Sequence, residues 1–447
     1  MTVTPRAGLK TLHHRSDWNT SRLKFIFKRE TRMVSENDEV ITAFRDGTVT
    51  LRKNRREDGF TFAEKEIGYQ GIEPDDLVIH AMDGFAGAIG VSDSRGKGSP
   101  VLTIATPISD AFPRYWGYYL RSLAISGFIQ SLAKGIRERS TDFRWKDASN
   151  LLVNHPDLAT QRRIADFLDR ETARIDLLIE KKQRLGEVLN STHSAATLRV
   201  LNDGYSEQIY DSSSNRLIFH EMREGWHRVR VKHIVSHMTS GSRGWSDLIS
   251  DKGELFLQSG CITRKMGVSL NDAPRIAPQE GAEAVRTRVN QFDTLVCITG
   301  GRTGAVGFIE SSPEPAYINQ HVCLLRPNKK RIYPRLLAQM LFSEIGQIQF
   351  QMAQYGLKQG LGFGEVANVA VPLPPREIQE TISKEITLAS ERLDLASRGV
   401  NTSITRLKEY RSALITAAVT GQIDVETYAQ SGTTDRRIDA LEQEATA

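Results

Sequence analysis

Apolar residues recur at alternating steps of four and three along two long stretches of the chain. In the first stretch the apolar positions are Ile164, Leu168, Ile175, Leu178, Leu185 and Leu189. This spacing is the heptad pattern of a helix that packs along one stripe against another helix. No glycine or proline lies between Pro156 and Gly186, so the pattern predicts one helix from about residue 158 to past Ser194.

The second stretch carries the same pattern with one additional step of four. Its apolar positions are Ile382, Ile386, Leu393, Val400, Ile404, Leu407 and Leu414. The step from Val400 to Ile404 is a stutter, an insertion that locally unwinds a coiled coil. Each helix would be about 60–67 Å long at ~1.5 Å per residue. One apolar stripe cannot be buried alone, so we expect the two helices to pair antiparallel and to hold globular units at opposite ends. A separate dimeric coiled coil is the alternative.

Both stretches belong to an internal repeat with an offset of about 218 residues (Val153 to Val371). The matched blocks are Val153-Asn154-His155-Pro156 with Val371-Pro372-Leu373-Pro374, Gln161-Arg162-Arg163-Ile164 with Gln379-Glu380-Thr381-Ile382, and Arg174-Ile175-Asp176 with Arg392-Leu393-Asp394. Further upstream the matches are Leu77-Val78 with Leu295-Val296, Gly87-Ala88-Ile89-Gly90 with Gly304-Ala305-Val306-Gly307, and Gly135-Ile136-Arg137 with Gly356-Leu357-Lys358.

Each copy begins with short β-rich runs and continues into a helical pattern, at 113–133 in the first copy and from Pro334 in the second. The fold class is therefore α+β, with two pseudo-repeated α+β domains separated by a long antiparallel two-helix coiled coil. The expected organisation is a first domain (1–157), a first long helix (158–203), a linker (204–225), a second domain (226–375), a second long helix (376–422) and a polar, loosely held tail (423–447).

Composition narrows the class of protein only in part. No apolar run approaches the ~20 residues that cross a bilayer, and the first residues lack a signal-peptide core, so a cytoplasmic protein is expected. Cys261, Cys297 and Cys323 lack metal-binding spacing and are expected to be buried, reduced thiols. A net charge of +5 permits a polyanionic partner without requiring one.

A catalytic motif is missing from the sequence. It contains no phosphate-binding GxxxxGK[ST] loop, no HExxH and no GxSxG, and the run Gly300–Gly304 is interpreted as a tight turn between strands. The sequence contains no Asn-Pro-Pro-aromatic or Asp-Pro-Pro-aromatic run. The chain is therefore not expected to methylate adenine itself. His80, Asp83 and His321 are interpreted as ordinary structural residues rather than metal ligands. The chain is interpreted as a binding protein without catalytic or metal residues, with a stand-alone DNA-modifying enzyme and a protein-only coiled-coil adaptor as alternatives.

Basic and polar clusters in both copies are candidates for DNA contact, because Arg reads guanine, Gln reads adenine, and Lys, Ser and Thr bind the phosphate backbone. The alternative for any one cluster is a solvated surface loop. The candidates are Arg52, Lys53, Arg55, Arg56, Lys97, Arg137, Arg139, Arg144, Ser242, Arg243, Arg264, Lys265, Arg302, Thr303, Lys358 and Gln359.

Two motifs in the second copy resemble a known family. Val371-Pro372-Leu373-Pro374-Pro375 precedes Ile378-Gln379 at the start of the second long helix, and Val419-Thr420-Gly421-Gln422 lies at its end. The chain thereby resembles the specificity subunit of type I restriction–modification systems over almost its whole length. The first copy departs from this pattern, since Asn154-His155 stand at the place of Pro372-Leu373 and no Val-Thr-Gly ends its helix.

The resemblance implies a DNA-binding, non-catalytic subunit with two target-recognition domains. Each domain would read one half of a split DNA site, while the helices fix the spacer and dock two methylation subunits. Motor–nuclease subunits would complete the complex. The resemblance further implies that this chain binds no cofactor itself, and that S-adenosylmethionine, ATP and Mg²⁺ bind to the partner subunits. A target adenine would be flipped out of the duplex into the methylation subunit.

Overall fold

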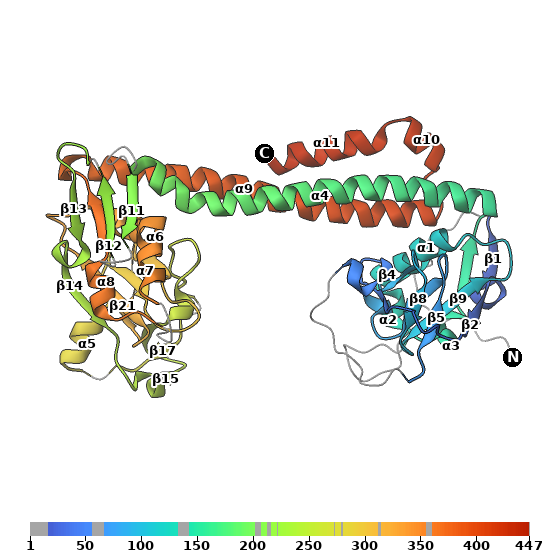
Figure 1. Ribbon diagram of the computed structural model, residues 1–447, viewed down its shortest axis with the longest axis horizontal. Helices are drawn as coiled ribbons and strands as arrows, with labels where there is room; N and C mark the ends of the chain where they lie inside the picture. Colours follow the sequence, from blue (N-terminus) through green and yellow to red (C-terminus); the bar gives the residue numbers. More distant parts are fainter. Residues whose placement is uncertain are drawn as a thin grey trace. The chain divides into compact units, whose positions relative to one another are not determined.

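The computed structural model describes residues 17–55, 67–132, 143–201, 207–211, 216–220, 222–271, 273–278, 280–311, 314–354 and 360–446 (Figure 1). The chain forms two compact units. The first unit consists of Met1–Arg184 and Gly399–Ala447, and the second unit consists of Leu185–Arg398. Both units combine helices and sheets, which confirms the predicted α+β class.

An antiparallel four-stranded sheet lies in the first unit, in the order β2 (Phe27–Glu30), β9 (Leu102–Pro107), β6 (Leu77–His80) and β7 (Ile89–Val91). The central strand β6 buries residues on both faces. Leu77 and Ile79 join the core on the helix side, and Val78 joins a second core on the other side. An unbroken apolar run is the sequence pattern of a strand covered on both faces.

The second unit repeats this sheet with β14 (Val235–Ser240), β21 (Val322–Pro327), β18 (Thr294–Cys297) and β19 (Val306–Phe308). The register corrects one sequence match. Leu77 pairs with Val91 in the first unit, and Thr294 pairs with Phe308 in the second. Leu77-Val78 therefore corresponds to Thr294-Leu295, one residue before the predicted Leu295-Val296. Both segments are apolar, so sequence matching alone could not fix the register.

The remaining strands differ between the units. The first unit adds two strand pairs, β3 (Ile41–Ala43) with β4 (Val49–Leu51) and β5 (Gln70–Ile72) with β8 (Gly96–Gly98). The second unit instead adds one four-stranded sheet, in the order β15 (Ile249–Ser250), β17 (Arg275–Ile276), β16 (Glu254–Leu257) and β20 (Ala316–Ile318). In this sheet β16 and β20 are parallel.

Helices cover one face of each repeated sheet. Those of the first unit are α1 (Pro113–Ile125), α2 (Phe128–Ser131) and α3 (Trp145–Ala148), and those of the second are α6 (Pro334–Phe342), α7 (Glu344–Met352) and α8 (Phe363–Asn368). The short helix α5 (Ala282–Thr287) instead packs on the sheet that contains β16 and β20. Pro113 and Pro334 both occupy the first helical turn, where a missing N–H costs nothing. The predicted helix over 113–133 is interrupted after Ile125, because Gly127 adopts the left-handed conformation at φ +78°.

Each long helix follows a strand that pairs with the start of its unit. The strand β10 (Leu152–His155) pairs with β1 (Asn19–Arg22) and leads into α4 (Leu158–Leu201). The strand β22 (Ala370–Leu373) pairs with β13 (His227–Arg230) and leads into α9 (Arg376–Val419). Short 3-10 helices follow the first strand of each pair, η1 (Leu23–Phe25) and η5 (Val231–His233).

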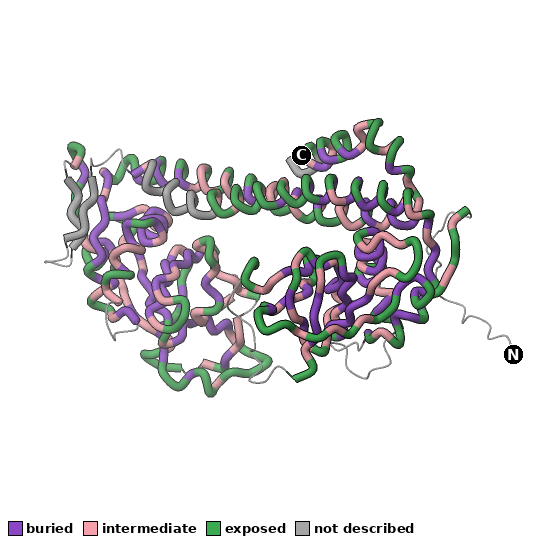
Figure 2. The backbone as a smooth tube through the Cα atoms, turned by 45° about the vertical axis from the view of Figure 1, so that its right-hand side comes forward, coloured by how far each residue is buried: buried purple, intermediate pink, exposed green. Residues whose placement is uncertain are grey.

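Within the first unit, α4 and α9 pack antiparallel, and α1 lies below them in the view of Figure 1. Arg163 of α4 pairs with Glu426, just beyond the end of α9, and Asp176 further along α4 accepts hydrogen bonds from Arg411, earlier in α9. In the second unit the last residue of α4, Leu201, shares a core with Ile382 and Ile386 of α9. Buried and exposed residues alternate along both helices in Figure 2, as an apolar stripe requires.

The predicted seam positions differ in burial. Seven of them are buried: Ile164, Leu168, Ile175, Ile382, Ile386, Leu407 and Leu414. Five are half-buried: Leu178, Leu189, Leu393, Val400 and Ile404. Leu185, at the border of the first unit, is 48% exposed and is not a buried seam position. The helical pattern in that part of the chain continues without complete burial of its stripe.

Two segments differ from the expected linker and tail. A hairpin of β11 (Glu207–Asp211) and β12 (Arg216–His220) occupies the segment expected to be a linker. The segment expected to be a loose tail forms α10 (Val425–Gln430) and α11 (Thr433–Thr446). Val425 and Ile438 are buried in the core of the first unit, and Leu441 is also buried, so a few apolar residues suffice to pack this polar segment.

Candidate nucleic-acid interface

The loop after the central strand occupies the same place in both units. Ala81 follows β6 and donates its N–H to the carbonyl of Val101 at 2.8 Å, and Ile298 follows β18 and donates to His321 at 2.8 Å. The carbonyls of the same two residues also accept equivalent hydrogen bonds. The N–H of Phe143 donates to Ala81 at 2.9 Å, and the N–H of Leu361 donates to Ile298 at 2.7 Å. The described backbone therefore brings the same set of loops to one edge of the sheet in each unit, where varied side chains can be presented from a constant frame.

In the first unit this edge carries mixed charge. Arg45 donates to Asp83 at 2.7 Å, and the backbone N–H of Asp83 donates to Nδ1 of His80 at 2.9 Å. Burial lowers the pKa of His80, although Asp83 acts in the opposite direction. Arg144 is an exposed residue immediately before α3 at the same edge. His80 and Asp83 are thus held within one loop, and no group of three or more potential metal ligands exists among the residues that the structure describes.

In the second unit the edge contains the turn Gly300–Gly304. Thr303 donates its hydroxyl to the Gly300 carbonyl at 2.7 Å, and Arg302 donates to the carbonyls of Gly260 and Ile262. The turn joins β18 to β19, as the sequence predicted, and Arg302 serves to hold the neighbouring loop. Ser242 is fully buried beside Asn319, so its hydroxyl cannot reach DNA in this arrangement.

Most basic candidates of the first unit have acidic or polar partners. Lys53 pairs with Glu39, and Arg55 pairs with Asp46 and lies over the ring of Phe44. The Nε of Arg52 is 3.4 Å from the Thr42 hydroxyl oxygen. The bridge between Val40 and Lys97 brings Lys97 beside Arg52, whose N–H donates to Val40. The candidates Arg52, Lys53, Arg55 and Lys97 therefore form one cluster, in which carboxylates offset part of the positive charge.

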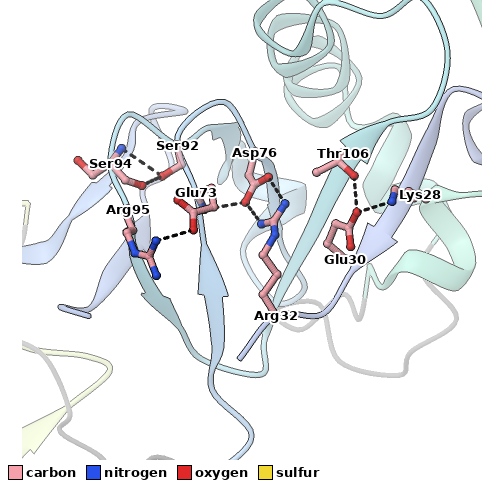
Figure 3. A network of polar contacts seen from close by, with 9 residues as sticks. All are labelled: Lys28, Glu30, Arg32, Glu73, Asp76, Ser92, Ser94, Arg95 and Thr106. Atoms are coloured by element: carbon pink, nitrogen blue, oxygen red, sulfur yellow. Dashed lines mark hydrogen bonds and ion pairs between the residues drawn. The ribbon is translucent and has the colours of Figure 1, made fainter. Parts of the chain in front are cut away.

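A second network neutralises the neighbouring cations (Figure 3). Arg95 pairs with Glu73 at 3.1 Å and with Asp38 at 3.2 Å. Arg32 pairs with the buried carboxylate of Asp76 through both of its terminal nitrogens. The hydrogen bonds that Arg32 donates to Asp76 raise the pKa of Arg32 above its ordinary value. These arginines stabilise the loops of the first unit more than they supply free positive charge.

Two of the candidate cations in the second unit lack such partners among the described residues. Arg243 and Arg264 are exposed, and neither has a hydrogen-bond or ion-pair partner within the described chain. The next residue, Lys265, pairs with Asp394 of α9. The loop of Arg264 and Lys265 lies beside Arg302, because Arg302 binds the carbonyl of Ile262. The remaining candidates Arg56, Arg137, Arg139, Lys358 and Gln359 lie outside the described residues.

In each unit a buried glutamine joins the globular part to the long helix. The sequence motifs did not predict this role. The side-chain oxygen of Gln161 accepts from the N–H of Phe112 at 3.0 Å and from Nε1 of Trp116 at 3.1 Å, and its nitrogen donates to Pro156 at 2.9 Å. Gln379 repeats this arrangement with the N–H of Tyr333 at 2.7 Å and the carbonyl of Pro374 at 2.9 Å. The exact repeat of Gln in the two matched blocks was the signal for this role.

The three cysteines are buried and form no disulfide, as predicted. Burial raises the pKa of the Cys323 thiol to about 12 and also raises the pKa of Cys297, so both thiols stay protonated. No helix in the described part of the chain is long and apolar enough to span a membrane.

Comparisons with known proteins all find similarity to type I restriction–modification specificity proteins. Residues 252–406 match the family model of the type I restriction modification DNA specificity domain. The specificity subunit of the type I restriction enzyme EcoBI from Escherichia coli is 21% identical over 370 residues, covering 80% of this chain and 76% of the relative. The StySPI specificity subunit from Salmonella potsdam is 22% identical over 383 residues, covering 81% of this chain and 78% of the relative.

Two solved structures share the fold. A chain from a study of complex assembly and conformational transition of the type I R-M system has a TM-score of 0.66 at 15% identity, covering 92% of this chain and 99% of that chain. The HsdS subunit from Thermoanaerobacter tengcongensis has a TM-score of 0.53 at 16% identity, covering 92% of this chain and 98% of that chain. These similarities confirm the resemblance that the sequence motifs indicated: the chain is similar to type I restriction–modification specificity subunits along most of its length, and residues 252–406 match their DNA specificity domain.

Proposed function

We propose that this chain is the DNA-recognition subunit of a type I restriction–modification complex and performs no chemistry itself. Each unit reads one half of a bipartite DNA site. The two long helices set the spacer between the half-sites and dock two methylation subunits, and motor–nuclease subunits join the assembly. S-adenosylmethionine, ATP and Mg²⁺ bind to those partners.

The observation that carries this proposal is the duplication of the frame together with the divergence of what it supports. The repeated sheets share strand order and register, and Gln161 and Gln379 attach both to their helices with equivalent bonds. The outer strands and the loop residues differ. A constant frame with varied contact residues suits a protein that reads two different short sequences at a fixed separation.

Mapping of methylated adenines tests the proposal directly. DNA exposed to this chain together with its methylation subunits should carry methyl groups in two short sequences separated by a constant spacer. The purified chain alone, supplied with methyl donor or with ATP and Mg²⁺, should leave DNA unchanged. Activity of the isolated chain would support the stand-alone enzyme instead, and failure of the assembled complex to bind DNA would support the protein-only adaptor.

The ruler role is tested by removing residues 401–404. This deletion takes out the stutter and restores an uninterrupted alternation of four and three between Val400 and Leu407. We expect an altered spacer with both half-sites unchanged. An unchanged spacer would contradict the role of the helices as a ruler.

Arg264 and Lys265 offer a matched pair for DNA contact in the second unit. Arg264→Ala should weaken DNA binding and reduce the slope of log affinity against log salt by about one, because an exposed guanidinium can release one counterion from the phosphate backbone. Lys265→Ala should leave that slope nearly unchanged, because Asp394 already neutralises its ammonium. Equal effects of the two substitutions would contradict this assignment.

A further inference from the structure

A polar cleft of about 220 Å³ opens in the first unit between its sheet and the helix pair. Its walls come from the loop after β3, the strand β7, the helix α1 and the two long helices. The charged and hydroxyl groups that line it are Asp46, Arg114, Tyr118, Arg121, Asp169 and Arg411. All of them belong to the first unit.

The backbone of the cleft is built around the side chain of Arg121. A Cβ atom on Gly47 would lie 2.8 Å from Cδ of Arg121, and one on Gly87 would lie 3.5 Å from its Nε. Both glycines have left-handed backbones, at φ +91° and +97°. Gly87 belongs to the repeated glycine motif of the sequence, and it is the carbonyl oxygen of Arg45, 2.6 Å from the place of a Cβ atom, that requires glycine there. Gly47 is therefore the glycine that leaves room for the Arg121 side chain.

Every other arginine at the cleft has a carboxylate from within the unit. Arg114 pairs with Asp169, which also accepts from the Tyr118 hydroxyl at 2.9 Å. Arg411 binds both oxygens of Asp176, at 2.8 and 2.9 Å. Asp46, the remaining carboxylate of the cleft, pairs with Arg55, which lies outside the cleft lining.

Arg121 alone among the three arginines that line the cleft has no hydrogen-bonded carboxylate among the described residues. Its Nε is buried and makes no hydrogen bond to the described residues. Burial, followed by repulsion from Arg411, lowers the pKa of Arg121 to about 10, so it remains charged at neutral pH. Asp46 and Asp176 attract this guanidinium, but neither binds it directly. Because a half-buried guanidinium without a hydrogen-bonded carboxylate is costly, an external carboxylate would offset that cost.

We propose that this cleft receives an acidic side chain of the methylation subunit that docks on the first unit, with Arg121 as its bidentate partner. This inference rests on the proposed function. A carboxylate fits because a planar guanidinium fork matches it and because the other two arginines of the cleft, Arg114 and Arg411, bind carboxylates. A protein partner fits because α4 and α9, the proposed docking helices, supply Asp169 and Arg411 to the walls.

The described residues of the second unit do not repeat this arrangement around Arg121. Pro113 and Pro334 begin equivalent helices, so Arg121 corresponds to Phe342. The equivalent cleft of the second unit contains Arg335, which is already paired with Glu310. The acidic contact is therefore specific to the docking place on the first unit.

The test measures the affinity of the purified methylation subunit for the full-length chain, at two salt concentrations. Arg121→Gln should weaken binding at least tenfold and reduce its salt dependence, and Arg121→Glu should weaken it further. Arg121→Lys should recover only part of the affinity, because it keeps the charge and loses the fork. Arg29→Gln, on the exposed side of β2, is the control and should change nothing.

A charge exchange keeps the test independent of folding. Among Asp→Arg and Glu→Arg variants of the methylation subunit, one should bind Arg121→Glu more tightly than it binds the wild-type chain. The inference is overturned if Arg121→Gln binds the methylation subunit normally, and an accompanying loss of DNA affinity would assign the cleft to a DNA phosphate. If the wild-type chain does not bind the methylation subunit, the proposed function fails and the inference fails with it.

Discussion

In the first unit the sheet β2-β9-β6-β7 packs against two strand pairs, whereas in the second unit the equivalent sheet β14-β21-β18-β19 packs against one four-stranded sheet. The helix side of both sheets is built alike, with a proline-initiated helix and a buried glutamine from the long helix. The comparison teaches that the frame and its attachment to the helices are repeated, while the surface on the other side is free to vary. Asymmetry also appears on the helix side, where Arg121 corresponds to Phe342 and only the first unit carries α10 and α11.

The helix seam gives the largest expected effect. Leu168 and its counterpart Ile386 are buried in the cores of the first and second units. Leu168→Ala should destabilise the first unit by about 3 kcal/mol, through lost burial and the cavity that remains, and Ile386→Ala should act on the second unit alone. Hydrogen exchange read separately over each unit measures both. The exposed Leu185→Ala is the control, with an expected change below about 0.5 kcal/mol.

The buried glutamines test whether the two attachments are equivalent. Gln161→Ala leaves the N–H of Phe112 and Nε1 of Trp116 without an acceptor, and should destabilise the first unit by about 2–3 kcal/mol. Gln379→Ala should cost somewhat less, because it orphans one donor, the N–H of Tyr333. Chemical denaturation followed separately for each unit would show this order. The exposed Gln130→Ala is the control. If Gln161→Ala or Gln379→Ala lowered the stability of its unit no more than this control does, the role of that glutamine as an attachment would be contradicted.

The C-terminal helices sharpen the comparison, since they belong to the first unit only. Ile438 is buried in its core, so Ile438→Ala should destabilise that unit by about 2 kcal/mol and leave the second unit unchanged. Arg174→Ala removes an exposed ion pair between α4 and Asp435, which lies on the same helix as Ile438. This substitution should cost no more than about 0.5 kcal/mol. Protection of both units in hydrogen exchange measures the difference. Equal protection in all variants would show that the tail contributes nothing.

The smallest effect concerns alkaline pH. Burial raises the pKa of Tyr118 to about 12 from an ordinary value of 10, whereas its counterpart in the second unit, Gln339, does not titrate. A raised pKa of an acid means that the unfolded state releases its proton first. The contribution of Tyr118 to stability is therefore fully present below pH 10 and is lost as the pH rises through 12. Tyr118→Phe should make the stability of the first unit fall less steeply over that interval, as read by denaturant titrations at several pH values.

The long helices could be predicted because their apolar spacing is local and uninterrupted by proline. The strand register could not, because Leu77-Val78 resembles both Thr294-Leu295 and Leu295-Val296, and only the hydrogen bonds to β7 and β19 distinguish them. The packing of the tail depends on Val425 and Ile438, which share a core with residues far away in sequence.

The basic candidates show the same limit. Lys265 is exposed in a charged loop, but its partner Asp394 lies 129 residues further along the chain. Arg121 stood inside a helix that sequence periodicity assigned to packing, and its unpaired state depends on a fold that brings Gly47, Gly87 and Arg411 around it. Charge and composition identify cations; the fold decides which of them remain available for a partner.

The central claim is that each unit reads its own half of the DNA site. Exchanging residues 226–370 for those of a relative with a different specificity, and then mapping methylated adenines, tests it most directly. One half-site should change to that of the relative, while the other half-site and the spacer stay as they were. A change in both half-sites, or in neither, would contradict the account.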